Sequence, residues 1–174
     1  MKYMIIFFLL FPLTSFAKKV EVKKRSTVVI ADIKVPSEFE IKKNLFNTPL
    51  LIWHKKYKHS GPTLALFPLK KAPLGHGSKK AIKTNFKKFK KEMMANLKSL
   101  DATEIKFINP VVVSDTTRFE VLYTMSKLAR LHASETQKRC KNGSGLTIKT
   151  LLKQKQVKEF KTLLLKTVDS VTCD

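Results

Sequence analysis

A chain of 174 residues, 43% of them hydrophobic, can bury one core, and it has no linker long enough to divide two domains. Its 35 Lys and Arg residues against 13 Asp and Glu residues give a formal net charge of +22. A lysine-favouring codon bias would raise Glu as well, so the shortage of acids indicates that the charge itself has a role. The charge predicts an anionic partner and makes catalysis by paired carboxylates a poor expectation.

The first 17 residues have the pattern of a secretory signal peptide. Lys2 supplies the positive start, an apolar run extends from Met4 to Leu13, and the small residues Ser15 and Ala17 occupy positions −3 and −1. We therefore expect cleavage after Ala17 and export to the periplasm or the extracellular space. The run is too short to span a bilayer comfortably as a permanent helix, and a retained, uncleaved anchor is the alternative.

The part of the chain before residue 70 is predicted to be rich in strands. Residues 18–25, KKVEVKKR, are expected to form a frayed basic arm in front of a single domain of residues 26–174. Four segments rich in β-branched or apolar residues then read as strands, separated by Pro, Gly and Ser turns: 26–35, 39–41, 50–57 and 63–69. Residues 70–80 are expected to be a surface loop.

Residues 81–100, AIKTNFKKFKKEMMANLKSL, predict an amphipathic helix. At about 100° per residue, six apolar side chains fall within an arc of about 80° around the helix axis: Ile82, Phe86, Phe89, Met93, Leu97 and Leu100. The remaining surface carries lysines, with Glu92 as the one acid, so it lacks the salt bridges of an ordinary surface helix. We expect this face to bind an anionic surface through Lys83, Lys87, Lys88, Lys90 and Lys91, and the alternative is a charge run that is only solvated.

The second half of the chain repeats the order of strands followed by a helix. Strands are predicted at 103–113, interrupted at Asn109-Pro110, and at 117–125, 127–137 and 146–152. In the second of these, alternation places Phe119 and Val121 on one face and Glu120 on the other. A helix is predicted at 155–171, with an apolar stripe of about 80°. The order predicts an α+β fold, an antiparallel sheet of roughly six to eight strands covered by two amphipathic helices.

The two cysteines, Cys140 and Cys173, both follow the predicted cleavage site. An even number of cysteines in an exported chain predicts one disulfide, which would join the end of the second helix to the end of a strand. Two free thiols or a thiol redox site are the alternatives, and no C-x-x-C spacing supports the second of them.

A second basic stretch, WHKKYKH at residues 53–59, interleaves aromatic rings with lysines. Lys55, Lys56 and Lys58 form a possible second anionic-surface patch, and Trp53 and Tyr57 are possible stacking or interface residues for nucleic acid or lipid headgroups. The simpler interpretation is a strand whose Trp53 enters the core and whose end is solvated.

No motif in the sequence indicates catalysis, a metal ion or a cofactor. His54 and His59 lie among lysines, which repel a metal ion, and His76 lies between two glycines in the predicted loop. There is no G-x-S-x-G nucleophile motif and no phosphate-binding loop with the required spacing. We therefore expect no catalytic residues, no metal and no cofactor.

The order of elements resembles the PsbP-like fold, an α/β/α sandwich around an antiparallel sheet. The segment from Val35 to Ile41, VPSEFEI, is similar to an early family segment in which a strand meets a proline and then an aromatic residue, although Phe39 stands where Trp is more usual. Residues 145–152 resemble the last strand of the family, and the helix after them resembles its closing helix through Phe160, Leu163, Leu164, Asp169, Ser170 and Val171. The resemblance spans about residues 26–172 and implies an accessory or binding protein rather than an enzyme.

These observations predict an exported, non-enzymatic accessory or binding protein that docks on an anionic membrane surface, a cell-envelope polymer or an acidic protein. One alternative is a nucleic-acid-binding protein that uses the same lysines together with Trp53 and Tyr57. A second alternative is a small hydrolase or thiol enzyme. No transmembrane segment is expected after cleavage of the signal peptide.

Overall fold

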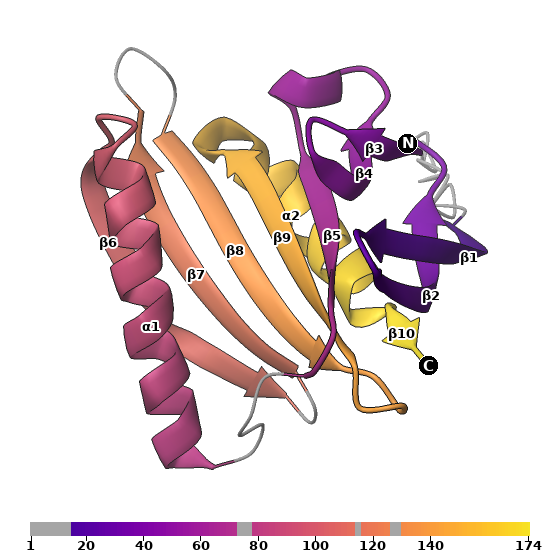
Figure 1. Ribbon diagram of the computed structural model, residues 1–174. Helices are drawn as coiled ribbons and strands as arrows, with labels where there is room; N and C mark the ends of the chain where they lie inside the picture. The colour runs from indigo at the N-terminus through magenta and orange to yellow at the C-terminus, as the bar shows by residue number, and fades with distance from the viewer. Residues whose placement is uncertain (1–14, 73–77, 114–115, 126–129) are drawn as a thin grey trace, which may run out of the picture.

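A seven-stranded antiparallel sheet forms the centre of the molecule, with α1 on one face and α2 on the other (Figure 1). The computed structural model describes residues 15–72, 78–113, 116–125 and 130–174. The large sheet has the order β3-β4-β5-β9-β8-β7-β6, and a small sheet has the order β1-β2-β10. The elements are β1 Ser15–Lys24, β2 Thr27–Pro36, β3 Phe39–Leu45, β4 Thr48–His54, η1 Lys58–Ser60 (a 3-10 helix), β5 Thr63–Leu69, α1 Lys79–Lys98, β6 Thr103–Val113, β7 Thr116–Thr124, β8 Arg130–Arg139, β9 Gly145–Lys153, α2 Gln154–Asp169 and β10 Thr172–Cys173. The predicted α+β fold is confirmed.

The alternation of apolar residues along the strands supplies two separate cores, one on each face of the large sheet. Phe119 and Val121 of β7 face α1, where Phe89 and Leu97 are buried against them. Leu64 and Leu66 of β5 belong to the other core, which also contains the apolar stripe of α2 and the inward residues of the small sheet. The small sheet therefore lies beside α2 on the same face, and it contacts β4 and β5.

The basic arm predicted at residues 18–25 is a strand, and the prediction of a frayed segment is wrong. β1 pairs antiparallel with β2 along its whole length, from Ser15 opposite Pro36 to Lys24 opposite Thr27. The sequence pattern did not indicate this strand, because most residues of KKVEVKK are charged and only Val20 and Val22 point inward. Both valines are buried in the core, which explains why the strand is stable despite its charge.

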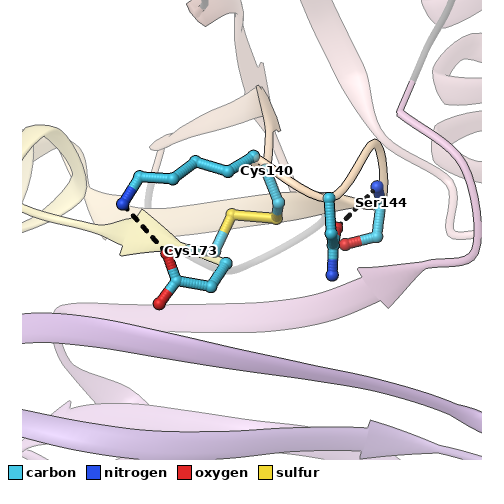
Figure 2. Close-up of a disulfide and its surroundings, with 6 residues drawn as sticks. Cys140, Ser144 and Cys173 are labelled. Carbon is cyan, nitrogen blue, oxygen red and sulfur yellow. Dashed lines mark hydrogen bonds and ion pairs between the residues drawn. A yellow bond between two sulfur atoms is a disulfide. The ribbon is translucent and has the colours of Figure 1, made fainter.

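The predicted disulfide between Cys140 and Cys173 is present, with an S–S distance of 1.99 Å (Figure 2). It joins the residue after β8 to β10, a two-residue strand that the sequence analysis did not predict and that pairs with β2. Lys141 and Asp174, the neighbours of the two cysteines in the chain, form an ion pair of 3.1 Å. The bridge thus connects the small sheet to the end of the large one.

The remaining strand and helix predictions agree with the structure to within a few residues at most ends. The interruption predicted at Asn109-Pro110 is a shift of the β6–β7 register between Ile108 and Val111. β8 places His132 and Ser134 on one buried face. The predicted start of this strand at residues 127–129 and the loop residue His76 lie outside the described residues. Of the helices within the described ranges, none is long and apolar enough to cross a bilayer.

Candidate functional site

The lysine-rich face of α1 points away from the sheet because aromatic packing fixes the rotation of the helix. Phe89 lies 5.1 Å from Phe119 and 6.0 Å from Phe107, measured between ring centroids, and Phe86 stacks on Phe119 at 5.8 Å. The helix begins at a serine cap, where Ser78 Oγ accepts a hydrogen bond from the Ala81 N–H at 3.1 Å. The core contacts of one stripe therefore force the opposite stripe into solvent.

All five lysines predicted on this helix are exposed, and few have a compensating partner. Lys88 Nζ lies 3.9 Å from Glu92 Oε1, an exposed pair that contributes little energy. Lys90 Nζ lies 4.8 Å from the centre of the Phe86 ring. Lys83, Lys87 and Lys91 have no ion-pair or hydrogen-bond partner among the described residues. Their positive charge is therefore available to an external anion.

The second basic patch is exposed but separate from α1. Lys55, Lys56 and Lys58 lie in the turn between β4 and β5, while α1 packs on β6 and β7. Three strand spacings, about 14 Å, separate β5 from β7 in the sheet. Lys55 Nζ is already engaged, because it donates to the Ser37 carbonyl at 2.6 Å. The structure therefore does not combine the two predicted patches into one surface.

Both aromatic residues of the second stretch are at least partly buried. Trp53 is only 7% exposed, and its indole N–H donates to Glu40 Oε1 at 2.6 Å, which lowers the pKa of that carboxyl. Tyr57 is half-buried against the α2-side core, with its ring 6.0 Å from that of Phe160 and 4.9 Å from that of His54. The burial of Trp53 agrees with the simpler interpretation and leaves little of its ring exposed for stacking, whereas an interface role of Tyr57 stays a prediction.

A groove of about 390 Å³ runs beside α1, and the sequence analysis did not predict it. Its lining comes from α1, β5, β8 and β9: Leu69, Asn85, Lys88, Phe89, Glu92, Glu135, Gln137 and Thr147. The groove exists because α1 packs over β6 and β7, so the neighbouring strands have no helix in front of them (Figure 1). No sequence signal identified it, because its lining residues are far apart in the chain.

A buried polar cluster links the sheet to α2. Glu120 Oε2 accepts a hydrogen bond from His132 Nε2 at 2.8 Å and pairs with Lys161 Nζ at 3.0 Å. The hydrogen bond to His132, together with Lys161, lowers the pKa of Glu120 to about 2 in spite of its burial. His132 Nδ1 is buried and has no partner among the described residues. Only one ring nitrogen of His132, Nε2, therefore has a hydrogen-bond partner among the described residues. Through Glu120, the cluster connects β7 and β8 to Lys161 of α2.

The enzymatic alternative would need a metal site or a free nucleophile. The residues that the structure describes contain no group of three or more potential metal ligands. Both sulfur atoms are in the disulfide, so neither cysteine is a free thiol nucleophile in this state. His54 packs among the rings of Phe39, Tyr57 and Phe160, and burial lowers its pKa.

Comparison with solved structures identifies the fold. Cyanobacterial PsbP (CyanoP) from Synechocystis sp. PCC 6803 superposes with a TM-score of 0.56 at 11% identity, covering 81% of this chain and 85% of that one. The chain has the PsbP-like fold. The PsbP-like chain is also similar to the Ran-binding protein Mog1p of Saccharomyces cerevisiae, with a TM-score of 0.54 at 12% identity over 91% of this chain and 95% of that one.

A third neighbour of the PsbP-like chain is LpqN of Mycobacterium tuberculosis, a protein involved in cell envelope biogenesis. It aligns with a TM-score of 0.54 at 10% identity, covering 90% of this chain and 91% of that one. No protein-family model and no curated protein matches the sequence. At such low identity the likeness concerns the fold, and no functional residue transfers from these proteins.

Proposed function

We propose that this protein is exported and acts as a non-enzymatic binding protein that docks on an anionic membrane surface through the outer face of α1. The observation that carries the proposal is a row of exposed lysines on a helix whose other face is held by aromatic packing. These are Lys83, Lys87 and Lys91, and none of them has an ion-pair or hydrogen-bond partner among the residues that the structure describes. A rigid helix presents these charges together, so they act on one surface. Each lysine near an anionic bilayer adds about 1 kcal/mol to binding, and the attraction weakens as salt rises.

Two further observations support export, and the fold neighbours support a binding role. The first 17 residues have the signal-peptide pattern, and the disulfide is typical of exported proteins. Two neighbours in the fold are named for binding Ran and for a role in the cell envelope. Nucleic acid is a weaker candidate partner, since the ring of Trp53 is buried.

Vesicle binding tests the proposal. Changing Lys83, Lys87 and Lys91 to Glu should weaken binding to vesicles of phosphatidylglycerol and phosphatidylcholine by well over tenfold, given about 1 kcal/mol for each lysine. The matched control changes Lys155, Lys158 and Lys166 to Glu, three exposed residues of α2 on the opposite face of the sheet. The control has the same net charge as the test variant and should bind nearly as tightly as the parent.

Circular dichroism and thermal unfolding must show that both variants remain folded. Equal losses in the two variants would mean that only net charge matters, and undiminished binding of the α1 variant would contradict the assignment. Competition with single-stranded DNA at fixed salt separates the lipid surface from nucleic acid, because DNA should displace the protein from vesicles only weakly if the surface is the partner.

A further inference from the structure

The groove beside α1 carries two ion pairs that face it from opposite walls. On the helix, Lys88 and Glu92 form an exposed pair of 3.9 Å, with side chains 74% and 64% exposed. On the sheet, Lys149 Nζ lies 3.4 Å from Glu135 Oε2, and the Glu135 side chain is only 16% exposed. Lys88, Glu92 and Glu135 line the groove directly, while Lys149 reaches it through its contact with Glu135.

This arrangement differs from the rest of a strongly basic surface. Two of the 13 acidic residues of the chain face one groove, so a simple anion would be repelled there by Glu92 and Glu135. A simple cation would be repelled by the paired lysines. A ligand with a positive and a negative group a few bonds apart avoids both repulsions. Its cationic group can pair with the two glutamates, and its anionic group can pair with the two lysines.

We propose that this groove binds the headgroup of a zwitterionic aminophospholipid, phosphatidylethanolamine, with its ammonium on Glu135 and Glu92 and its phosphate on Lys88 and Lys149. The proposal rests on the proposed docking of α1 and deepens it by naming a headgroup. Lys88 follows Lys87 in the chain and lies on the flank of the helix whose outer face meets the membrane, so the groove opens beside the proposed contact. The volume of about 390 Å³ accommodates a phosphoethanolamine group.

The chemistry of the sheet-side wall favours a primary ammonium. Glu135 Oε1 accepts a hydrogen bond from Gln137 Nε2 at 3.1 Å, which holds the carboxylate in place. Its low exposure reduces the local dielectric and strengthens its attraction for a cation. A primary ammonium has three N–H donors for Glu135 and Glu92, whereas the trimethylammonium of phosphatidylcholine has none.

The test compares vesicles that differ only in the zwitterionic lipid. At a constant fraction of phosphatidylglycerol and constant salt, the parent protein should bind vesicles with phosphatidylethanolamine about tenfold more tightly than vesicles with phosphatidylcholine, the ratio expected for one charge-assisted hydrogen bond. Glu135→Gln and Glu92→Gln should each reduce this ratio toward one. Glu92→Gln changes an exposed residue, so this variant should fold normally. Glu159→Gln, an exposed residue of α2, is the control and should keep the full ratio.

A soluble probe separates this inference from the membrane proposal. Glycerophosphoethanolamine should shift the backbone amide resonances of Glu135, Gln137 and Thr147 in the parent, and glycerophosphocholine should shift them far less. Shifts with this probe in a protein that binds no vesicle would support the headgroup site and refute the docking of α1. Tight binding to both vesicle types with no ethanolamine preference would overturn the headgroup site and leave the docking intact. A preference that survives in both Glu variants would also overturn it, since the selectivity would then come from elsewhere.

Discussion

Individual charged residues in this protein serve two opposite purposes. Lys83, Lys87 and Lys91 remain in solvent and have no partner within the described part of the chain. Glu120 is instead buried, and its Oε2 bonds to both His132 and Lys161. A buried carboxylate is tolerated only when hydrogen bonds and an opposite charge replace its hydration. Glu120 therefore stabilises the interior, whereas the three lysines contribute charge to the surface.

Acid should loosen the contact between α2 and the sheet through Glu120. Because the folded state lowers the pKa of Glu120 from 4.5 to about 2, the stabilisation is fully present above pH 4.5 and is lost as pH falls toward 2. Glu120→Gln should lower the free energy of unfolding at neutral pH by about 2–3 kcal/mol. Urea unfolding from pH 7 to pH 2.5 should show a smaller acid-induced loss in the variant, and a loss equal to the parent's would contradict the role of this carboxylate.

Reduction of the disulfide should destabilise the fold without abolishing its secondary structure. The bridge closes a loop with a sequence separation of 33 residues, which corresponds to about 3–4 kcal/mol in the loop-closure account. Cys140→Ser should therefore lower the thermal midpoint by about 10 °C. Because Cys173→Ser removes the same bridge, it is expected to give the same decrease. Two midpoints equal to the parent's would show that the bridge contributes no stability.

Two lysine-rich elements, β1 and α1, differ in where they pack rather than in their charge. β1 and α1 are both rich in lysine, and each buries only one narrow apolar stripe. β1 pairs with β2 and closes the core on the α2 side, whereas α1 lies over one end of the sheet. The placement of α1 leaves the groove beside it open.

Removal of β1 should unfold the domain. A chain that begins at Ser26 loses Val20 and Val22, each worth about 1.5–3 kcal/mol of burial, and exposes the edge of β2. A chain that begins at Lys18 keeps both valines and should melt close to the full-length protein in a calorimetric scan. If the chain beginning at Ser26 melted equally high, residues 18–25 would be a dispensable arm.

The whole molecule is a two-sided sandwich with a strong net charge. The face covered by α1 carries the proposed docking surface and the groove, while α2 and the disulfide-linked small sheet lie on the opposite face (Figure 1). A second groove of about 400 Å³ lies on the α2 side, and Ser15, which precedes the predicted cleavage site, is part of its lining. Cleavage after Ala17 would remove Ser15 and so take away part of the lining of this second groove.

Protein from the cell envelope should begin at Lys18. Cleavage after Ala17 removes the first three residues of β1 and leaves the pairs from Lys18 opposite Ile33 to Lys24 opposite Thr27. Intact-mass measurement on protein from that fraction should show the loss of residues 1–17. Recovery of the full-length chain from the cytosol would remove the case for export.

The sequence alone determined where most strands and both helices lie and that the lysines of α1 point to solvent, and it favoured pairing of the two cysteines over free thiols. Each of these depends on local periodicity or on residue chemistry. Local periodicity reports that a side chain is buried but not what it is buried against. Only the tertiary structure therefore decided that Val20 and Val22 make β1 a strand, that His132 and Lys161 converge on Glu120, and that α1 stops short of β9. For the same reason the groove, whose walls come from residues as distant as Leu69 and Thr147, became visible only when the strand order β5-β9-β8 brought them together.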